Sequence, residues 1–120
     1  MTTVSAGDWL EAIFAAVDGK NVAGFTAFLH PDVRFRFGNM PVVEGLNAVS
    51  EFVGGFFASV EAAQHRIDAH WPIDGGIVCH GWVTYTRLDG SSLTVPFSNI
   101  FLFNGEAVGT YLIFADLSGL

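Results

Sequence analysis

The chain has 120 residues, a length that fits one domain with a substantial core, and we treat residues 1–120 as a single domain. Hydrophobic residues make up 51% of it and charged residues only 14%, which excludes an intrinsically disordered chain. The formal net charge is −7, and the few basic residues form no cluster, so the sequence argues against a nucleic-acid partner. Twelve Phe and three Trp exceed what a solid core of this size needs, which favours an aromatic-lined cavity or a subunit contact.

The N-terminal sequence MTTVSAGDW lacks the basic start and the apolar run of a secretory signal. No stretch of about 20 residues is free of both charge and Gly, so no membrane segment is predicted. We therefore expect a cytoplasmic protein. Cys79 is the single cysteine and lies in the apolar run GIVCHGW, where a buried cysteine usually serves as a small hydrophobe.

Two helices are predicted near the N-terminus. Residues 8–18 carry apolar side chains at helical spacing, with Ser5 available as a cap and Gly19 as a stop. Asn21 can cap a second, short helix. That helix ends at the pair His30-Pro31, because a residue before proline resists the helical conformation. The two helices are expected to form a hairpin.

A strand and a third helix follow. Residues 32–37 (DVRFRF) alternate between apolar and basic side chains, which is typical of a half-buried strand. Residues 46–60 place apolar side chains on one broad helical face. Gly54 and Gly55 lie in the middle of this helix, and each costs about 1 kcal/mol relative to Ala. The pair therefore indicates either close packing against another element or a bend in the helix, and of the two we expect close packing.

The rest of the chain is predicted to form four long antiparallel strands. The period changes to two in residues 65–71, 76–88, 92–103 and 107–117, which are separated by Asp-Gly and Asn-Gly turn signals. The order helix, helix, strand, helix and four strands predicts an α+β fold, with helices covering one face of a curved sheet. The last two strands are apolar on both faces, whereas a solvent-facing sheet surface is usually polar. We therefore expect a homodimer formed through the sheet face that the helices leave open.

The segments that carry this order are DVRFRF (32–37), VVEGLNAVSEFV (42–53), YTRLDGSSLTVPFSNIF (85–101) and YLIFAD (111–116). With them the chain resembles the SnoaL-like group of the nuclear transport factor 2-like superfamily, over nearly its whole length. This superfamily also contains ketosteroid isomerases, scytalone dehydratases and limonene epoxide hydrolases. The resemblance implies a cone-shaped fold in which three helices and a mixed sheet enclose a deep apolar pocket.

The resemblance also implies pocket residues. In SnoaL-like cyclases and limonene epoxide hydrolases the last strand carries an acid/base Asp, and the spacing of Val108, Phe114 and Asp116 reproduces its surroundings. Because these positions differ by even numbers, an unbroken strand points Asp116 to the same face as Val108 and Phe114. A carboxylate on such an apolar strand would lose hydration, and its pKa would rise towards that of a general base. The alternative is that Asp116 lies at the strand exit and caps the final turn.

Other functional groups of the superfamily are absent. The positions of the three ionisable residues of ketosteroid isomerases fall on or near Phe14, Phe37 and Asn99. The epoxide hydrolase set also fails, because Phe97 and Asn99 occupy the positions of its Arg and first Asp. Neither specific chemistry is therefore expected.

Two polar residues are candidate helpers of Asp116. Asn99 lies between apolar residues of one strand face, where it would hold a ligand carbonyl, stabilise an oxyanion, or bond a neighbouring group or a buried water. His80 lies in mid-strand and would carry a proton, or serve as a structural histidine. Tyr85 and Tyr111 would donate to a ligand or lie in the dimer contact, and for Tyr111 we favour the contact.

The four histidines show no metal-site spacing, so neither a metal nor a cofactor is expected. The expected ligand-binding wall consists of the following residues: Trp9, Phe14, Phe28, Phe52, Phe56, Trp82, Phe97, Phe101, Leu112 and Phe114.

The leading hypothesis is a protein that binds a hydrophobic small molecule and, if it is an enzyme, performs cofactor-free isomerisation, cyclisation, dehydration or hydrolysis. Asp116, Asn99 and His80 would carry that chemistry. Two non-catalytic roles compete with it: a ligand carrier or dimeric interaction module, and a helper subunit of a larger enzyme.

Overall fold

The computed structural model of the protein describes residues 5–120. The helices are α1 (Ala6–Asp18), α2 (Val22–Thr26) and α3 (Leu46–Ser59). The strands are β1 (Leu29–Phe37), β2 (Val43–Glu44), β3 (Val60–Ile73), β4 (Gly76–Arg87), β5 (Ser92–Asn104) and β6 (Ala107–Ala115). They form one sheet in the order β2-β1-β6-β5-β4-β3, in which β1 and β6 are parallel and the other pairs antiparallel.

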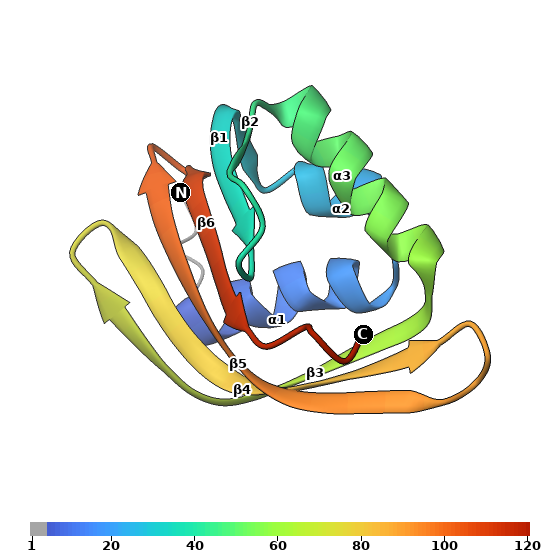
Figure 1. Ribbon diagram of the computed structural model, residues 1–120. Helices are drawn as coiled ribbons and strands as arrows, with labels where there is room; N and C mark the ends of the chain where they lie inside the picture. The colour runs from blue at the N-terminus through green and yellow to red at the C-terminus, as the bar shows by residue number, and fades with distance from the viewer. Residues whose placement is uncertain (1–4) are drawn as a thin grey trace.

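The three helices lie on the concave side of the curved sheet (Figure 1). The long strands β3, β4 and β5 bend beneath α1, and α3 covers the other end of the concave side. The predicted α+β fold with a helix-covered, mostly antiparallel mixed sheet is thus confirmed. No helix of residues 5–120 is long and apolar enough to cross a membrane.

Local capping explains where the first helices begin. The Ser5 side chain accepts a hydrogen bond from the backbone N–H of Asp8 at 3.1 Å, and the Asn21 side chain accepts one from Gly24 at 3.0 Å. Both caps confirm the sequence predictions. The second helix is shorter than expected, because β1 already begins at Leu29.

The glycine pair of α3 does not pack as we expected. A Cβ added at Gly54 would meet only Val22, at 3.8 Å, and one added at Gly55 would meet nothing within 4 Å. Close approach of another element therefore does not explain this pair, and the prediction is wrong. The two glycines instead leave the middle of α3 with a low helix propensity, one turn before its C-terminal end.

A β-bulge in β6 decides which of its side chains face inward. Leu102 and Phe103 are neighbours on β5, but they pair with Thr110 and Val108 on β6, so Gly109 is an extra residue. Val108 and Tyr111 are therefore both buried although their separation is odd. Beyond the bulge, side-chain direction is opposite to that of an unbroken strand.

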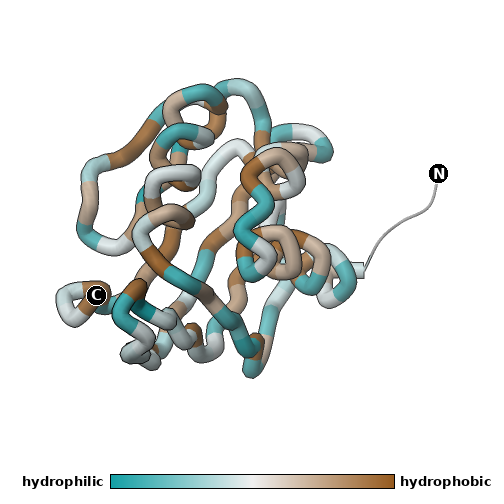
Figure 2. Tube along the Cα trace, turned by 90° about the vertical axis from the view of Figure 1, so that its right-hand side faces the viewer, coloured by the Kyte–Doolittle hydropathy of each residue, from teal (hydrophilic) through white to brown (hydrophobic). Residues whose placement is uncertain are grey.

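The core fills the space between the helices and the concave face of the sheet. Trp9 of α1 packs edge-on against Phe28, Phe101 and Phe103, with ring centroids 5.0–5.7 Å apart, and fills one end of this space. Hydrophobic residues occur both in the helices and in the strands (Figure 2).

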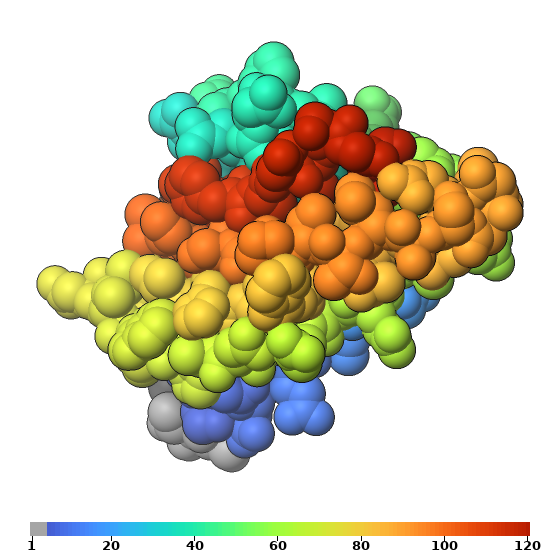
Figure 3. Space-filling model, turned by 60° about the horizontal axis from the view of Figure 1, so that its bottom comes forward, coloured from blue at the N-terminus to red at the C-terminus, as the bar shows by residue number. Residues whose placement is uncertain are grey.

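On the opposite face of the sheet no helix of residues 5–120 lies, and β4, β5 and β6 run across it in view (Figure 3). Its exposed large apolar residues include Trp82 at 40%, Leu102 at 37% and Phe114 at 42% of full exposure. The Trp71 ring stacks on His80 on this face, with centroids 5.6 Å apart. We call this surface, made by Trp71, Trp82, Leu102, Phe114 and their neighbours, the outer face.

Candidate functional site

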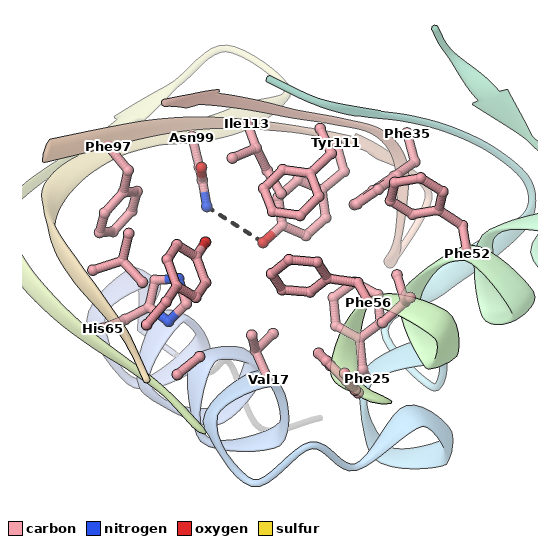
Figure 4. Close-up of a pocket in the computed structure, with 16 residues that line it drawn as sticks. Val17, Phe25, Phe35, Phe52, Phe56, His65, Phe97, Asn99, Tyr111 and Ile113 are labelled. Carbon is pink, nitrogen blue, oxygen red and sulfur yellow. Dashed lines mark hydrogen bonds between the residues drawn. The ribbon is translucent and has the colours of Figure 1, made fainter. Parts of the chain in front are cut away.

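A cavity lies between the concave sheet and the helices (Figure 4). The space open to the centre of a water-sized sphere inside it is about 40 Å³. Its walls are mostly aromatic and aliphatic, and sixteen residues line it: Val17, Phe25, Phe35, Phe37, Phe52, Val53, Phe56, Phe57, Ala63, His65, Val83, Tyr85, Phe97, Asn99, Tyr111 and Ile113. A dry apolar chamber with a few polar groups is the usual form of a small-molecule site.

Asn99 and Tyr111 form the polar centre of the sheet wall. Asn99 lies on β5 and Tyr111 on β6, and Asn99 Nδ2 donates a hydrogen bond to Tyr111 Oη at 3.3 Å (Figure 4). The two residues are only 1% and 2% exposed. Burial raises the pKa of Tyr111 well above its ordinary value, so its hydroxyl stays protonated and can donate a hydrogen bond.

Tyr85 of β4 adds a second buried phenol to the wall. It is 3% exposed, and its ring meets the Phe56 ring edge-on at 5.6 Å. Burial, together with the negative charge of Asp18, raises the pKa of Tyr85 above its ordinary range. Tyr85 is thus also a neutral donor at physiological pH.

The ionisable pair of the site joins α1 to β3. Asp18 Oδ1 lies 2.6 Å from His65 Nδ1, and Asp18 Oδ2 accepts the backbone N–H of His65 at 2.9 Å. Asp18 lies in the last turn of α1, where the helix dipole disfavours a negative charge. The hydrogen bonds with His65 offset this unfavourable interaction of the Asp18 charge with the helix dipole. Lys20 fixes the same junction, because its Nζ donates to the backbone oxygens of Val60 and Glu61.

The pair fixes the tautomer of His65. A carboxylate only accepts hydrogen bonds, so Nδ1 carries the hydrogen and, in the neutral ring, Nε2 carries the lone pair of a base. The His65 side chain is 9% exposed and the Asp18 side chain 26%. His65 lines the cavity, and it also lines, with Asp18, an outer groove between α1 and β3. The pair therefore lies in the wall between the cavity and solvent.

The cavity has a mouth closed by aromatic rings. Phe37, Phe52 and Phe56 line the cavity and also an open depression of about 720 Å³. Leu88 and Leu120 are among the residues on the rim of that depression. A ligand entering from this side must move at least one of the three phenylalanines.

The structure corrects the prediction for Asp116. This residue follows the end of β6, is exposed, and does not line the cavity. Hydrogen bonds from Ser118 hold the pKa of the Asp116 carboxyl below its usual value, whereas a general base in an apolar pocket needs a raised one. The physical reason is the Gly109 bulge, which turns this end of the strand outward. Asp116 caps the final turn, which was the alternative that the sequence left open.

His80 and Trp82 also face away from the cavity. On β4, Ile77, Cys79, Val83 and Tyr85 are buried, whereas the residues of opposite parity include the exposed His80 and Trp82. His80 stacks on Trp71 on the outer face, so the structure does not place it beside the polar groups of the cavity.

The other predicted ligand-binding residues fall into three sets. Phe52, Phe56 and Phe97 line the cavity, and so does Asn99. Trp9, Phe14, Phe28 and Phe101 belong to the core packed next to it and are not lining residues. Leu112 and Phe114 point to the outer face because of the Gly109 bulge. The same bulge brings Tyr111 inward, so the expectation of a dimer contact for Tyr111 is wrong.

Sequence reasoning missed the pair of Asp18 and His65, which lie 47 positions apart. A signal was present, because an acidic residue at a helix C-terminus with no basic residue in the last turn needs a partner elsewhere. A second bulge, at Asp68, puts both His65 and His70 beside α1, although their separation is odd.

Comparison with solved structures shows the fold. A putative polyketide cyclase from Pseudomonas putida is 14% identical, with a TM-score of 0.82 over 96% of this chain and 94% of that one. A Catenulispora acidiphila protein of ketosteroid isomerase-like fold, solved with trimethylamine, is 15% identical, with a TM-score of 0.85 over 95% and 89%. TerC, crystallised with polyporic acid, is 16% identical, with a TM-score of 0.79 over 92% and 90%.

No curated protein matches the sequence. The model of the SnoaL-like domain, in contrast, matches residues 10–108, from the first helix to the start of the last strand. That span includes the Asp18–His65 pair and Asn99, whereas Tyr111 lies beyond it. The chain belongs to the SnoaL-like domain family.

Proposed function

We propose that the protein binds a small hydrophobic molecule in the aromatic cavity and catalyses a cofactor-independent proton transfer on it. One observation carries the proposal: His65, which is hydrogen-bonded to Asp18, and the Asn99–Tyr111 pair line the same largely apolar chamber. A base and neutral hydrogen-bond donors in a dry site are what abstraction of a proton next to a carbonyl requires.

Each residue has a separate role in this scheme. His65 Nε2 takes the proton from carbon, and Asp18 holds the ring in the required tautomer and stabilises its protonated form. The electron pair of the broken C–H bond moves to the carbonyl oxygen, which accepts a hydrogen bond from a tyrosine hydroxyl of the wall. Return of the proton from His65 to another carbon of the same molecule completes an isomerisation. In a cyclisation the enolate carbon instead attacks a second carbonyl carbon of the same molecule, the π electrons of that carbonyl move to its oxygen, and this oxygen takes the proton from His65.

The comparisons support this proposal at the level of the family. The match to the SnoaL-like domain and the likeness to two putative polyketide cyclases are compatible with ligand binding or cyclisation in the pocket.

The test is a thermal-shift screen with hydrophobic ketones, lactones, epoxides and steroids, followed by a turnover assay on every ligand that stabilises the protein. For a substrate found in this way, His65→Gln should lower kcat by about 10²–10⁴-fold, the usual contribution of a positioned base. Asp18→Asn should lower kcat less, because the base remains. His80→Gln on the outer face is the matched control and should leave kcat unchanged.

Ligand carriage without turnover is the second candidate, and the small cavity favours it. Ligands that stabilise the wild type and His65→Gln equally, with no product from either, would establish a carrier and refute the enzyme.

We also propose that the protein forms a homodimer through the outer face. The supporting observation is the apolar surface that includes Trp82, Leu102 and Phe114, which no helix covers. Light scattering behind a sizing column should give twice the chain mass for the wild type and the chain mass for Phe114→Asp. A monomeric wild type at about 100 μM would contradict the proposal, since a dimer too weak to form there has a Kd well above 100 μM.

A further inference from the structure

The side-chain oxygen of Asn99 has no hydrogen-bond partner among residues 5–120, although the residue is only 1% exposed. Its other polar atom is engaged, because Nδ2 donates to Tyr111 Oη. A buried acceptor without a donor costs about 1–3 kcal/mol. Asn99 lines the chamber, so a group bound in the chamber can supply the missing donor.

Tyr111 supplies a hydrogen-bond donor beside the free acceptor of Asn99. Its oxygen accepts the hydrogen bond from Asn99, which leaves its own O–H hydrogen free to donate. The two residues therefore present one acceptor, Asn99 Oδ1, beside one donor, the Tyr111 hydroxyl. A group that both donates and accepts, such as a hydroxyl, an enol or a phenol, satisfies both atoms at once.

The rest of the chamber disfavours charge. Of the residues that the structure describes, no Lys or Arg lines the cavity, and the nearest ionisable pair contains the carboxylate of Asp18. An anionic ligand would lose its hydration without gaining a cationic partner. The ligand that fits is neutral.

The volume of the chamber limits the size of the ligand. About 40 Å³ is room for very little beyond water, whereas an apolar cavity of about 150 Å³ binds benzene. A single ring therefore fits only when a phenylalanine at the mouth moves. Water can meet Asn99 Oδ1 when no ligand is bound, but a ligand that displaces this water must supply the donor itself.

We infer that the site selects a neutral, monocyclic ligand that places a hydroxyl, enol or phenol O–H on Asn99 Oδ1. Asn99 is then a specificity-determining residue, which favours hydroxylated ligands over those that offer a carbonyl alone. This inference rests on the proposed function, because it names the class of molecule that the proposed site takes.

The first test compares ligands of similar shape on the wild type. Phenol donates and accepts, benzaldehyde only accepts, and toluene does neither. Calorimetry or chemical-shift titration should give the order phenol, then benzaldehyde, then toluene, with phenol at least about tenfold tighter than toluene, the factor expected for one buried hydrogen bond. Benzaldehyde binding more tightly than phenol would overturn the inference, and so would the absence of binding by all three.

The second test changes the residue. Asn99→Leu conserves most of the side-chain volume and removes the acceptor, so the ratio of toluene Kd to phenol Kd should fall by about tenfold. The Kd for toluene should change by less than about threefold, because its contacts are apolar. A Kd ratio that stays as in the wild type would show that Asn99 only supports Tyr111. Asn99→Val, which also lacks an acceptor, is the variant to use if Asn99→Leu does not fold.

These titrations measure equilibrium binding and require no turnover. A protein that selects phenol through Asn99 but converts no ligand would retain the inference and lose the enzymatic proposal. Turnover of a ketone without any O–H group, together with an unchanged Kd ratio in Asn99→Leu, would retain the enzyme and overturn the inference.

Discussion

Phe101 and Leu102 are neighbours on β5, yet they belong to different environments. Phe101 is fully buried beneath α1, with its ring 5.0 Å from Trp9 and 4.4 Å from Tyr111. Leu102 points to the outer face and is 37% exposed. The inner face of the sheet is therefore where apolar residues contribute to folding, and the same kind of residue on the outer face remains available for another contact. Composition alone does not separate the two faces, because both carry aromatic rings.

The largest expected effect is on the inner face. Phe101→Ala should lower the free energy of unfolding by about 3–5 kcal/mol, because it removes a buried ring from between two others. Leu102→Ala, its neighbour, should cost less than about 1 kcal/mol, since only part of that side chain is buried. Urea denaturation over a series of protein concentrations measures both. Equal losses, independent of concentration, would contradict the difference between the faces.

Alkaline pH should also destabilise the protein through groups buried on the inner face. Burial raises the pKa of Cys79 from 9.0 to about 12, and it raises the pKa values of Tyr85 and Tyr111 above their ordinary 10.0. The folded protein therefore keeps protons that the unfolded chain releases, so stability is full below about pH 9 and falls as the pH rises towards 12. Each group contributes up to about 1.4 kcal/mol per pH unit.

Urea midpoints at pH 8, 9.5 and 10.5 check this prediction. The midpoint should fall at the two higher values, and Tyr85→Phe should fall less steeply between pH 9.5 and 10.5. A midpoint that is constant across the series would show that the buried groups do not control alkaline stability.

A smaller effect, of opposite sign, is expected at the mouth of the cavity. Gly54→Ala and Gly55→Ala should each raise the free energy of unfolding by about 0.5–1 kcal/mol, because both sites have room for a methyl group. If the glycine pair lets the end of α3 move so that Phe56 can open the mouth, the same variants should slow ligand association. Thermal melts and stopped-flow binding measure the two consequences separately. A lower melting temperature would contradict the packing seen at these positions.

The smallest effect is expected for Asp116→Asn. The residue is exposed, and its described hydrogen bond is with Ser118 in its own turn. Ligand affinity and kcat should both match the wild type, in contrast to His65→Gln. A large loss of kcat would restore Asp116 as a catalytic candidate and would contradict the proposal that the catalytic base lies in the cavity wall.

Most of the fold could be predicted from the sequence, because caps, periodicity and turn signals are local. The direction of side chains could not be predicted as well. On β4 the outward set mixes polar residues with the apolar Val78 and Trp82, and only the burial of Cys79 and its neighbours in the folded sheet shows clearly which set faces inward. On β6 the single residue Gly109 reverses the direction, and a glycine within a strand pattern is the available warning of such a bulge.

The candidate site illustrates the same limit. Asn99 was identified because it is a lone polar residue on an apolar strand face. The contact of His65 with Asp18 depends on how α1 lies against β3, which no local pattern contains.

The bulge at Gly109 also determines which kind of mutation can remake the cavity. A substitution on β6 alters one side chain of the wall. Deleting Gly109 would instead invert the strand beyond it, so that Tyr111 and Ile113 would leave the chamber while Leu112 and Phe114 entered it. Asn99 would lose its partner in the same event. In β6, deletion of one residue should therefore change the ligand preference of the cavity more than any single substitution.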